Sequence, residues 1–357
     1  MKAAPTRRLW KRIAIAAVAV CGVLVAGAAT YAGILAHKAD TALSRISAGA
    51  GEGAPAAPIV PDKGKDPAMK PMLFLIAGVD NREGGGGSMN TDVMMLAALN
   101  PERRAATIVS LPRDVQLKPK GLSSQKANYY YAYYYNKDRN EAITNTKSFF
   151  GDLLGLPVDY MAVINFDGFR KLVDALGGVR LEVDMDMRYI DDEDGTNINL
   201  KKGLQTLTGS QTLDFVRYRK SNQGTAESSD IARNERQHIV LEQLLDKLTT
   251  LGGITQWGKV LDIAGQSLKT DIPESVLRDW IGQFRQLKPE RIDFVPIDGK
   301  WDSPYIVPAE SAVQAAVNAL RAQLELPENP SFRPADVIGV EREETQTVTN
   351  DTYRKRP

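Results

Sequence analysis

The stretch 158-VDYMAVINFDGFRKLVDALGGVRLEV-183 contains two kinds of hydrophobic pattern in succession. Its ends, VDYMAVINF and VRLEV, are short and apolar, which is typical of buried strands. Between them, FDGFRKLVDALGG has apolar residues at helical spacing and a glycine pair where a helix C-cap belongs. Strand, helix and strand in alternation predict an α/β fold.

The same alternation continues on both sides of this stretch. Three upstream apolar runs, bounded by turn-forming or charged residues, predict buried strands at 72–79, 93–99 and 106–112. The other predicted elements are helices at 141–155, 231–251, about 256–268, 274–286 and about 309–324, and a strand at 291–297. We therefore predict a central mixed sheet flanked by helices, forming one domain at 71–330, with a loose polar tail at 331–357.

The N-terminus predicts a membrane anchor. Residues 13–35 contain no charge and are long enough to cross a bilayer as a helix, and five basic residues precede them within 1–12. A cleavable signal peptide is the alternative, but the apolar run is longer than its usual apolar region. We expect an uncleaved single-pass anchor in the cell membrane, with 1–12 cytoplasmic, a stalk at 36–70, and the domain outside.

The overall charge limits the classes of partner. Lysine and arginine number 45 against 44 acidic residues, a net charge of +1, which argues against a general nucleic-acid binder. Cys21 is the single cysteine, so the chain can form no internal disulfide and no cysteine-based metal site. Any site for an anion must therefore be a local cluster.

Such a cluster of guanidiniums occurs in 216-VRYRKSNQGTAESSDIARNERQHI-239. The segment DFVRYRK has the aromatic and β-branched content of a strand, which would place Arg217 and Arg219 on the same face. Arginine binds phosphate with two parallel hydrogen bonds, so the pair suggests a phosphate site. A carboxylate ligand or a solvated basic face are alternatives.

The helix that follows this segment would add to the cluster. Ser229 or Asp230 is a natural N-cap for it. Arg233, Arg236 and Gln237 have the spacing i, i+3 and i+4, which predicts a single helix face. The free backbone N–H groups of the first turn would lie beside them.

Carboxylates follow the predicted strands at one rim of the sheet. Asp80 ends one strand and Asp92 begins the next, with Arg82 in the glycine-rich loop between them. Paired carboxylates beside a phosphate are a usual way to hold Mg²⁺, although carboxylates that cap turns would look the same. Arg113 and Asp114 follow the strand at 106–112, where ligands of α/β sheets gather, or form an ordinary surface pair.

These motifs, in this order, resemble the LytR–CpsA–Psr family over roughly residues 72–250. The matching segments are LFLIAGVDNR, NTDVMMLAALNP, IVSLPRD, LGLPVDYMAVINFDGFRKLVDALGGVRLEV, LKKGLQTLTGSQTLDFVRYR and DIARNERQ. The resemblance implies a membrane-anchored extracytoplasmic enzyme. It would transfer a glycan phosphate from a polyprenyl-pyrophosphate-linked glycan to peptidoglycan or a comparable acceptor, and release polyprenyl phosphate.

The resemblance also implies roles for the arginines, the carboxylates and the glutamine named above. Asp80 and Asp92 would coordinate Mg²⁺ against the pyrophosphate, and Asp80, Asp92 or Asp114 would be the base. The residues that would bind the pyrophosphate oxygens are Arg113, Arg219, Arg233 and Gln237, with Arg82, Arg217 and Arg236 nearby. The family fold also holds a long apolar pocket for the prenyl chain. A pyrophosphatase that acts on the same lipid, or a non-catalytic lipid-binding or regulatory membrane protein, are the alternative functions.

Two features depart from the family pattern. Many members carry Arg-Ser-Asp-Thr where this chain has Asn90-Thr91-Asp92-Val93, so one guanidinium is missing unless Arg82 or Arg139 replaces it. Six tyrosines also occur in the seven residues 129–135. They would pack between a strand and a helix or form a sugar-stacking wall at the acceptor groove, and we favour packing.

Overall fold

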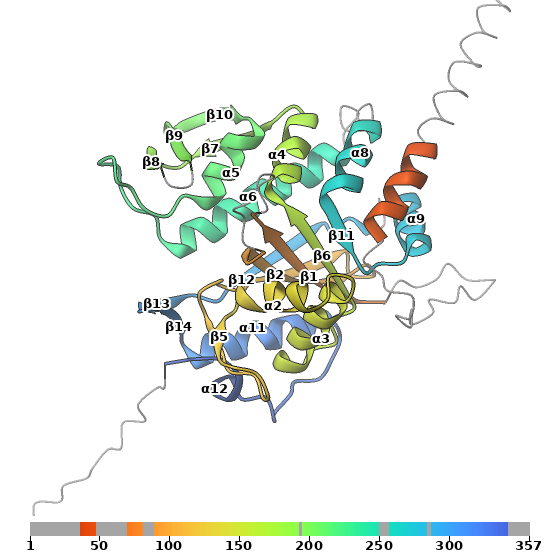
Figure 1. Ribbon diagram of the computed structural model, residues 1–357, viewed down its shortest axis with the longest axis vertical. Coiled ribbons are helices and arrows are strands. Elements are labelled where there is room, and N and C mark those ends of the chain that lie inside the picture. Colours follow the sequence, from red (N-terminus) through yellow and green to blue (C-terminus); the bar gives the residue numbers. More distant parts are fainter. Residues whose placement is uncertain are drawn as a thin grey trace, which may run out of the picture.

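A central mixed sheet of six strands organises the chain, in the order β11-β6-β1-β2-β3-β12 (Figure 1). The computed structural model describes residues 36–47, 70–80, 89–192, 195–249, 257–283 and 287–341. The strands are β1 Met72–Val79, β2 Thr91–Asn100, β3 Ala105–Ser110, β6 Tyr160–Asn165, β11 Leu268–Thr270 and β12 Arg291–Pro296. Pairs β1–β6 and β3–β12 are parallel, whereas β1–β2, β2–β3 and β6–β11 are antiparallel. The predicted central mixed sheet is confirmed.

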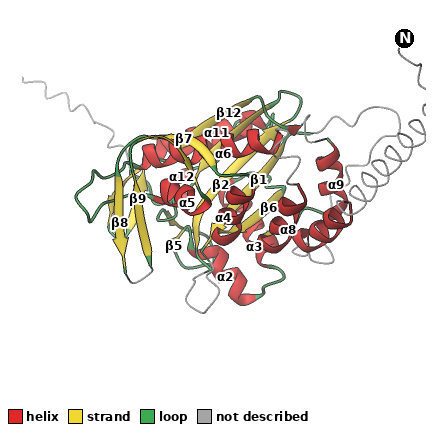
Figure 2. Ribbon diagram, turned by 90° about the horizontal axis from the view of Figure 1, so that it is seen from above, coloured by secondary structure: helices red, strands yellow, loops and turns green. Residues whose placement is uncertain are grey.

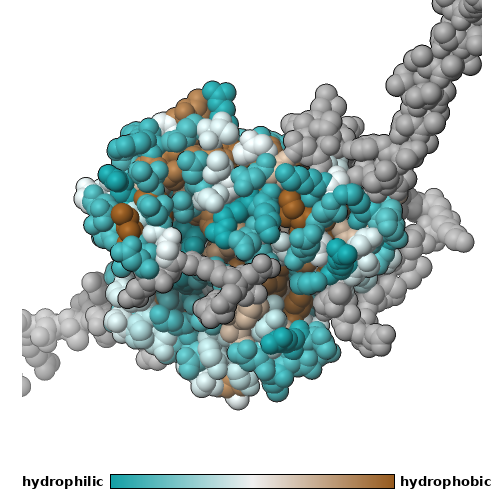
Figure 3. Space-filling view, turned by 45° about the horizontal axis from the view of Figure 1, so that its top comes forward, coloured by the Kyte–Doolittle hydropathy of each residue, from teal (hydrophilic) through white to brown (hydrophobic). Residues whose placement is uncertain are grey.

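Helices cover both faces of this sheet and bury a separate apolar cluster on each (Figure 1). One face is covered by α2 Tyr129–Lys137, α3 Ala142–Leu154, α11 Glu310–Gln323 and α12 Pro334–Val337. The other carries α4 Phe166–Ala175, α5 Gly209–Arg217, α6 Asp230–Thr249 and α8 Trp257–Ser267, with α9 Glu274–Gly282 at its edge. On the face seen in Figure 3 polar side chains predominate, and apolar ones gather only in small patches.

Within the described residues, four two-stranded sheets accompany the central sheet. They pair β7 Val179–Val183 with β10 Gly203–Leu207, β8 Met187–Asp191 with β9 Thr196–Leu200, β4 Gln116–Leu117 with β5 Gln125–Lys126, and β13 Gly299–Asp302 with β14 Tyr305–Pro308. Figure 2 shows the β8–β9 hairpin set apart from the central sheet. This hairpin and the β13–β14 hairpin later contribute side chains to the site.

The strand–helix–strand stretch that predicts the fold class forms β6, α4 and β7. The Asn165 side chain caps α4 by accepting a hydrogen bond from the Gly168 amide at 2.6 Å. Gly177 and Gly178 end the helix with φ angles of 78° and 77°, a region that favours glycine. A Cβ atom on Gly178 would lie 2.5 Å from the Leu207 carbonyl oxygen, so this position also has no room for a side chain.

The segment DFVRYRK does not form a strand, so this prediction is wrong. Residues 209–217 form α5, and Arg219 lies in the loop beyond it. A capping box begins the helix: Thr208 Oγ1 accepts from the Gln211 amide, and Gln211 Oε1 accepts from the Thr208 amide. Because these reciprocal hydrogen bonds satisfy otherwise unpaired groups, they favour a helix despite the aromatic and β-branched residues.

The predicted stalk at 36–70 is wrong at its start, because residues 36–46 form a helix packed on the domain (red in Figure 1). Ala42, Leu43 and Ile46 are buried, at 3%, 3% and 4% exposure. A Cβ atom on Gly265 of α8 would lie 3.1 Å from the Ala42 backbone, so the two helices pack closely.

The predicted loose tail at 331–357 is also wrong at its start. Phe332 and Ile338 are buried in the main core, at 7% and 0% exposure, and Ile338 bridges to Leu117. The folded domain therefore extends to residue 341.

The predicted anchor at 13–35 lies outside the described residues. Within the described part of the chain, no helix combines the length and apolar character that crossing a membrane requires.

Candidate functional site

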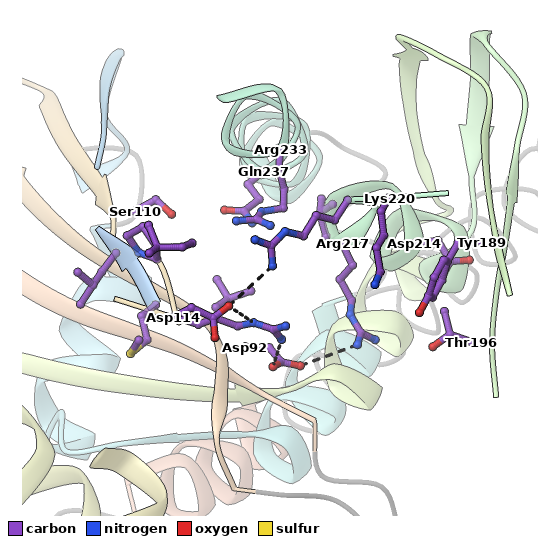
Figure 4. Close-up of a pocket in the computed structure, with 18 of the residues that line it drawn as sticks. Asp92, Ser110, Asp114, Tyr189, Thr196, Asp214, Arg217, Lys220, Arg233 and Gln237 are labelled. Carbon is purple, nitrogen blue, oxygen red and sulfur yellow. Dashed lines mark hydrogen bonds and ion pairs between the residues drawn. The ribbon is translucent and has the colours of Figure 1, made fainter. Parts of the chain in front are cut away.

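A cavity of about 370 Å³ lies where β2, β3, α5 and α6 meet, and the β8–β9 and β13–β14 hairpins contribute to its lining (Figure 4). The charged and hydrogen-bonding side chains that line it are Asp92, Ser110, Arg113, Asp114, Tyr189, Asp191, Thr196, Asp214, Arg217, Arg219, Lys220, Arg233 and Gln237. Members of every polar cluster that the sequence predicts therefore meet in one cavity, although Asp80 and Arg236 are not among its lining residues.

Asp92 is the carboxylate on which two arginines converge. Its Oδ1 lies 2.7 Å from Arg113 Nη1, and its Oδ2 lies 3.8 Å from Arg217 Nη2. The same Arg217 nitrogen lies 3.9 Å from Asp80 Oδ2. Arg217 also lies against the Phe166 ring, with its Cζ 5.1 Å from the ring centroid. One guanidinium thus joins the two carboxylates that the sequence proposes as metal ligands.

Asp114 organises a second group of cations. It is buried, with 6% exposure, and its Oδ1 accepts a hydrogen bond from Lys126 Nζ at 2.8 Å. Its Oδ2 lies 3.5 Å from Arg113 Nε and 3.7 Å from Arg219 Nη1. Burial acts to raise the pKa of Asp114, but the Lys126 hydrogen bond and the surrounding cations hold it below the ordinary value. Asp114 is therefore ionised at neutral pH, and it holds Lys126, Arg113 and Arg219 together.

Helix α6 contributes Arg233 and Gln237 from successive turns, and both point toward Asp92 and Asp114 (Figure 4). The Ser229 hydroxyl accepts from the Ala232 amide at 3.1 Å, which confirms a serine cap at the start of this helix. Gln237 Oε1 is buried, and among the described residues it has no hydrogen-bond partner. A buried amide in this state is suited to a polar ligand, since it gains a partner only when one binds.

Arg236 does not join the site, so its predicted place on the same face as Arg233 is wrong. It is 2% exposed, and its Nε and Nη2 donate to the two Asp184 carboxylate oxygens at 2.8 and 2.7 Å. Its Nη1 donates to Ser228 Oγ at 2.8 Å. Because a buried guanidinium requires a charged partner, Asp184 draws this side chain away from the cavity.

Arg82 and Arg139 are the two residues that the sequence offers as replacements for the guanidinium missing at position 90. Arg82 lies outside the described residues. Arg139 packs on the Tyr135 ring, with 5.3 Å between its Cζ and the ring centroid, and is not among the residues that line the cavity. The Arg217 guanidinium contacts both carboxylates, at 3.9 Å from Asp80 and 3.8 Å from Asp92.

Most of the tyrosine-rich segment packs against the core, as predicted. Tyr130 and Tyr131 are buried, at 1% and 5% exposure. Tyr130 stacks on Phe149, with 4.3 Å between ring centroids, and its hydroxyl donates to the Ser123 carbonyl at 2.9 Å. None of the six tyrosines lines the cavity.

Several lining residues were missed from the sequence. Tyr189, Asp191 and Thr196 come from the β8–β9 hairpin, and the Tyr189 hydroxyl donates to Asp191 Oδ2 at 3.0 Å. No local pattern marks a hairpin that reaches the site through tertiary structure. Asp214 precedes Arg217 by one helical turn of α5, so recognition of the Thr208–Gln211 capping box would have found it.

Asp214 differs electrostatically from the other carboxylates of the cavity. Burial raises its pKa to about 6, and the charges of Arg217 and Arg170 offset only part of that shift. The lining carries five cationic side chains against four carboxylates, and Asp214 is the carboxylate whose pKa is raised, so its charge is lost as pH falls toward 6. This balance favours an anionic ligand.

Comparisons with known proteins identify the family of this chain. The model of the LytR_cpsA_psr family matches residues 40–324. The polyisoprenyl-teichoic acid–peptidoglycan teichoic acid transferase TagT of Bacillus subtilis is 30% identical over 224 residues, which cover 61% of this chain and 65% of TagT, just under two thirds of its length. The corresponding transferase TagU of the same organism is 29% identical over 267 residues, 74% of this chain and 80% of TagU.

Solved structures resemble the fold over a similar span. Protein gbs0355 from Streptococcus agalactiae aligns with a TM-score of 0.60 and 25% identity, covering 74% of this chain and 91% of that one. TagT bound to LI-WTA aligns with a TM-score of 0.54 and 25% identity, covering 73% of this chain and 94% of that one. Since the family model extends over most of the chain, including the whole cavity, the protein belongs to the LytR–CpsA–Psr family.

Proposed function

We propose that this cavity transfers a glycopolymer phosphate from a polyprenyl-pyrophosphate carrier to a hydroxyl of peptidoglycan or a similar acceptor. The observation that carries the proposal is the convergence of Arg113, Arg217, Arg219 and Arg233 on one cavity that also holds Asp92. Guanidiniums bind phosphate oxygens in pairs, and a pyrophosphate offers enough oxygens for several of them. The names of TagT and TagU, both teichoic acid transferases, support the same chemistry.

In the proposed reaction, the acceptor hydroxyl oxygen forms a bond to the phosphorus that carries the glycan. The bond from that phosphorus to the bridging oxygen breaks, and polyprenyl phosphate leaves with the electron pair. The hydroxyl proton passes to Asp80, Asp92 or Asp114, the carboxylates that lie beside these arginines. The arginines hold the phosphates in line and stabilise the negative charge that develops on their oxygens.

The carboxylates present fit a magnesium ion. Asp80 and Asp92 approach the same Arg217 nitrogen, so their carboxylates face a common space. Within the described residues no group of three or more histidine, cysteine or acidic side chains is placed to hold a metal. Mg²⁺ suits such a site, since it takes one or two carboxylates and completes its shell with phosphate oxygens and water. When bound, it would neutralise charge on the pyrophosphate.

The decisive test is transfer by the purified full-length chain with Mg²⁺, a short-prenyl pyrophosphoryl glycan and peptidoglycan. We expect release of prenyl phosphate together with glycan bound to peptidoglycan. Arg219→Ala or Arg233→Ala should lower kcat/KM by about 100-fold or more, because each removes a charge that faces the transferred phosphate. Arg103→Ala is the matched control: Arg103 is half exposed, pairs with Glu325 at 3.0 Å, and lies outside the cavity.

Two outcomes would count against transfer. Release of prenyl phosphate without acceptor, at an unchanged rate, would indicate a pyrophosphatase. Failure of the wild-type chain to bind any prenyl pyrophosphate would contradict the proposal altogether.

The proposed metal site has its own test. Asp80→Asn and Asp92→Asn should both raise the Mg²⁺ concentration needed for half-maximal activity, and an unchanged requirement would contradict the metal site.

We also propose that residues 13–35 anchor the protein in the cell membrane with the domain on the outer side. The charge-free run and the basic residues before it support this placement. The helix at 36–46 follows directly and packs on α8, so the domain would lie close to the membrane surface. Retention in the membrane fraction after alkaline washing, with protease access only from outside intact cells, tests the arrangement.

A further inference from the structure

Trp301 lies on the β13–β14 hairpin, beside the cavity. Within the hairpin it pairs with Ile306, and Ile306 lines the cavity. The Ile306 amide donates to the Asp114 carbonyl at 2.9 Å, which fixes the hairpin to the segment that carries Arg113. The backbone therefore places Trp301 next to the arginines that face the ligand.

Two cations lie against the Trp301 ring. The Arg219 Cζ is 5.8 Å and the Lys126 Nζ is 5.6 Å from the ring centroid. Both cations also contact the Asp114 carboxylate, at 3.7 and 2.8 Å. The ring is thus part of the same charged cluster as Arg219, one of the arginines assigned to the phosphate.

Trp301 nevertheless remains 55% exposed. Among the described residues, the other large hydrophobic side chains that are comparably exposed are Leu204, at 59%, and Tyr129, at 36%. Single exposed apolar side chains are ordinary, so exposure alone indicates nothing. Trp301 differs because it lies beside a cavity lined by charged groups and contacts two cations, Arg219 of the lining and Lys126 outside it.

We propose that Trp301 is a stacking platform for a sugar ring that lies beside the phosphate in this cavity. The proposal rests on the proposed transfer function and names the part of the site that would recognise the carbohydrate. The C–H groups on one face of a pyranose carry partial positive charge, and they are attracted to the negative face of an indole ring. A phosphate held by Arg219 would place the attached sugar beside Trp301, because Arg219 touches both.

The sugar could belong to the donor glycan or to the acceptor glycan, and three probes separate the sources. The first probe, geranyl pyrophosphate with Mg²⁺, contains the pyrophosphate but no sugar. Geranyl pyrophosphoryl-N-acetylglucosamine represents the donor, and a soluble tetrasaccharide of N-acetylglucosamine and N-acetylmuramic acid represents the acceptor. Their dissociation constants are measured by calorimetry with the full-length wild type, Trp301→Ala and Trp301→Phe. Leu204→Ala is the control, because it removes an equally exposed apolar side chain on β10, outside the cavity.

We expect Trp301→Ala to weaken binding of one sugar-containing probe by about tenfold, which is typical of a lost aromatic stacking contact. Binding of geranyl pyrophosphate should change by less than about twofold, and Trp301→Phe should keep most of the affinity because it retains a ring. The probe that loses affinity identifies the source of the sugar.

Other outcomes would contradict the proposal that Trp301 stacks on a sugar ring. Equal weakening of all three probes would show that the ring positions Arg219 rather than contacting sugar. No change in any probe, or a wild type that binds neither sugar-containing probe, would exclude contact with a glycan. If the wild type fails to bind geranyl pyrophosphate but binds the tetrasaccharide through Trp301, the transfer function fails while the sugar platform stands.

Discussion

The guanidinium of Arg236 is buried against the carboxylate of Asp184, which lies 52 positions earlier in the chain, and two hydrogen bonds of 2.8 and 2.7 Å join them. The same guanidinium donates to Ser228 Oγ at 2.8 Å and lies 3.4 Å from the Tyr218 carbonyl. These contacts hold both ends of the loop that carries Arg219. An arginine that the sequence places in the ligand site is therefore the support behind it.

Arg236→Ala should lower the free energy of unfolding by about 2–3 kcal/mol, because it opens a cavity and removes two hydrogen bonds to the charged, half-exposed Asp184. Arg236→Met should cost less, since it fills most of the volume. Urea denaturation measures both. Asp186→Asn, which breaks the exposed pair with Lys201, is the control and should have little effect. If Arg236→Ala is as stable as this control, the supporting role is wrong.

Asp214→Asn should stabilise the protein in a way that depends on pH. The folded-state pKa of Asp214 is raised from 3.8 to about 6, so folding disfavours its charged form. The wild type therefore loses stability relative to the asparagine variant as pH rises through 6, and the two converge below pH 3.8. At pH 8 we expect a gain of about 1–2 kcal/mol, allowing for partial solvent screening. Unfolding curves from pH 4 to 8 test this, and a difference independent of pH would contradict it.

Asp114→Asn should have the opposite dependence. The folded-state pKa of Asp114 is lowered, so its charge stabilises the fold above its unfolded-state pKa and that contribution disappears as pH falls through the folded-state value. At pH 7 we expect a loss of about 1.5–3 kcal/mol, the range for a hydrogen bond to a charged group. Lys126→Met removes the same hydrogen bond from the other side and should give a similar loss. Equal destabilisation of Asp114→Asn at pH 7 and pH 3 would exclude the electrostatic explanation.

Leu43→Ala should destabilise the whole domain by about 2–4 kcal/mol, as large-to-small substitutions in cores do. Leu43 is 3% exposed in the helix at 36–46, which packs on α8. Ser44→Ala is the control, since Ser44 is exposed on the same helix. Thermal unfolding distinguishes the cases: equal melting temperatures for the two variants would show that this helix adds nothing to the fold.

Local sequence patterns predict the structure of a segment correctly where the interactions that stabilise it lie within that segment. The apolar runs that form β1, β2 and β3 and the glycine pair that ends α4 were predicted correctly, because burial and left-handed backbone leave local signals. The segment around Arg217 was predicted wrongly as a strand. Its aromatic and β-branched residues favoured a strand, whereas the capping box at Thr208 stabilises a helix.

The same contrast between local signals and long-range contacts applies to the arginines and carboxylates of the site. Residue type and order identified Asp92, Arg113 and Arg219, and the structure brings them together at one cavity. Helical spacing also predicted a shared face for Arg233 and Arg236, but a buried guanidinium requires an anion, and the partner is distant in sequence.

The sequence by itself determined the α/β class, the family, and the chemical groups of an anion site. Only the tertiary structure decided which groups face the ligand and what surrounds them. Tyr189 and Asp191 reach the cavity on one hairpin, and Trp301 lies beside it on another. The physical reason is that periodicity and capping act over a few residues, whereas the pairing of charges and the placement of hairpins depend on contacts between segments far apart in the chain.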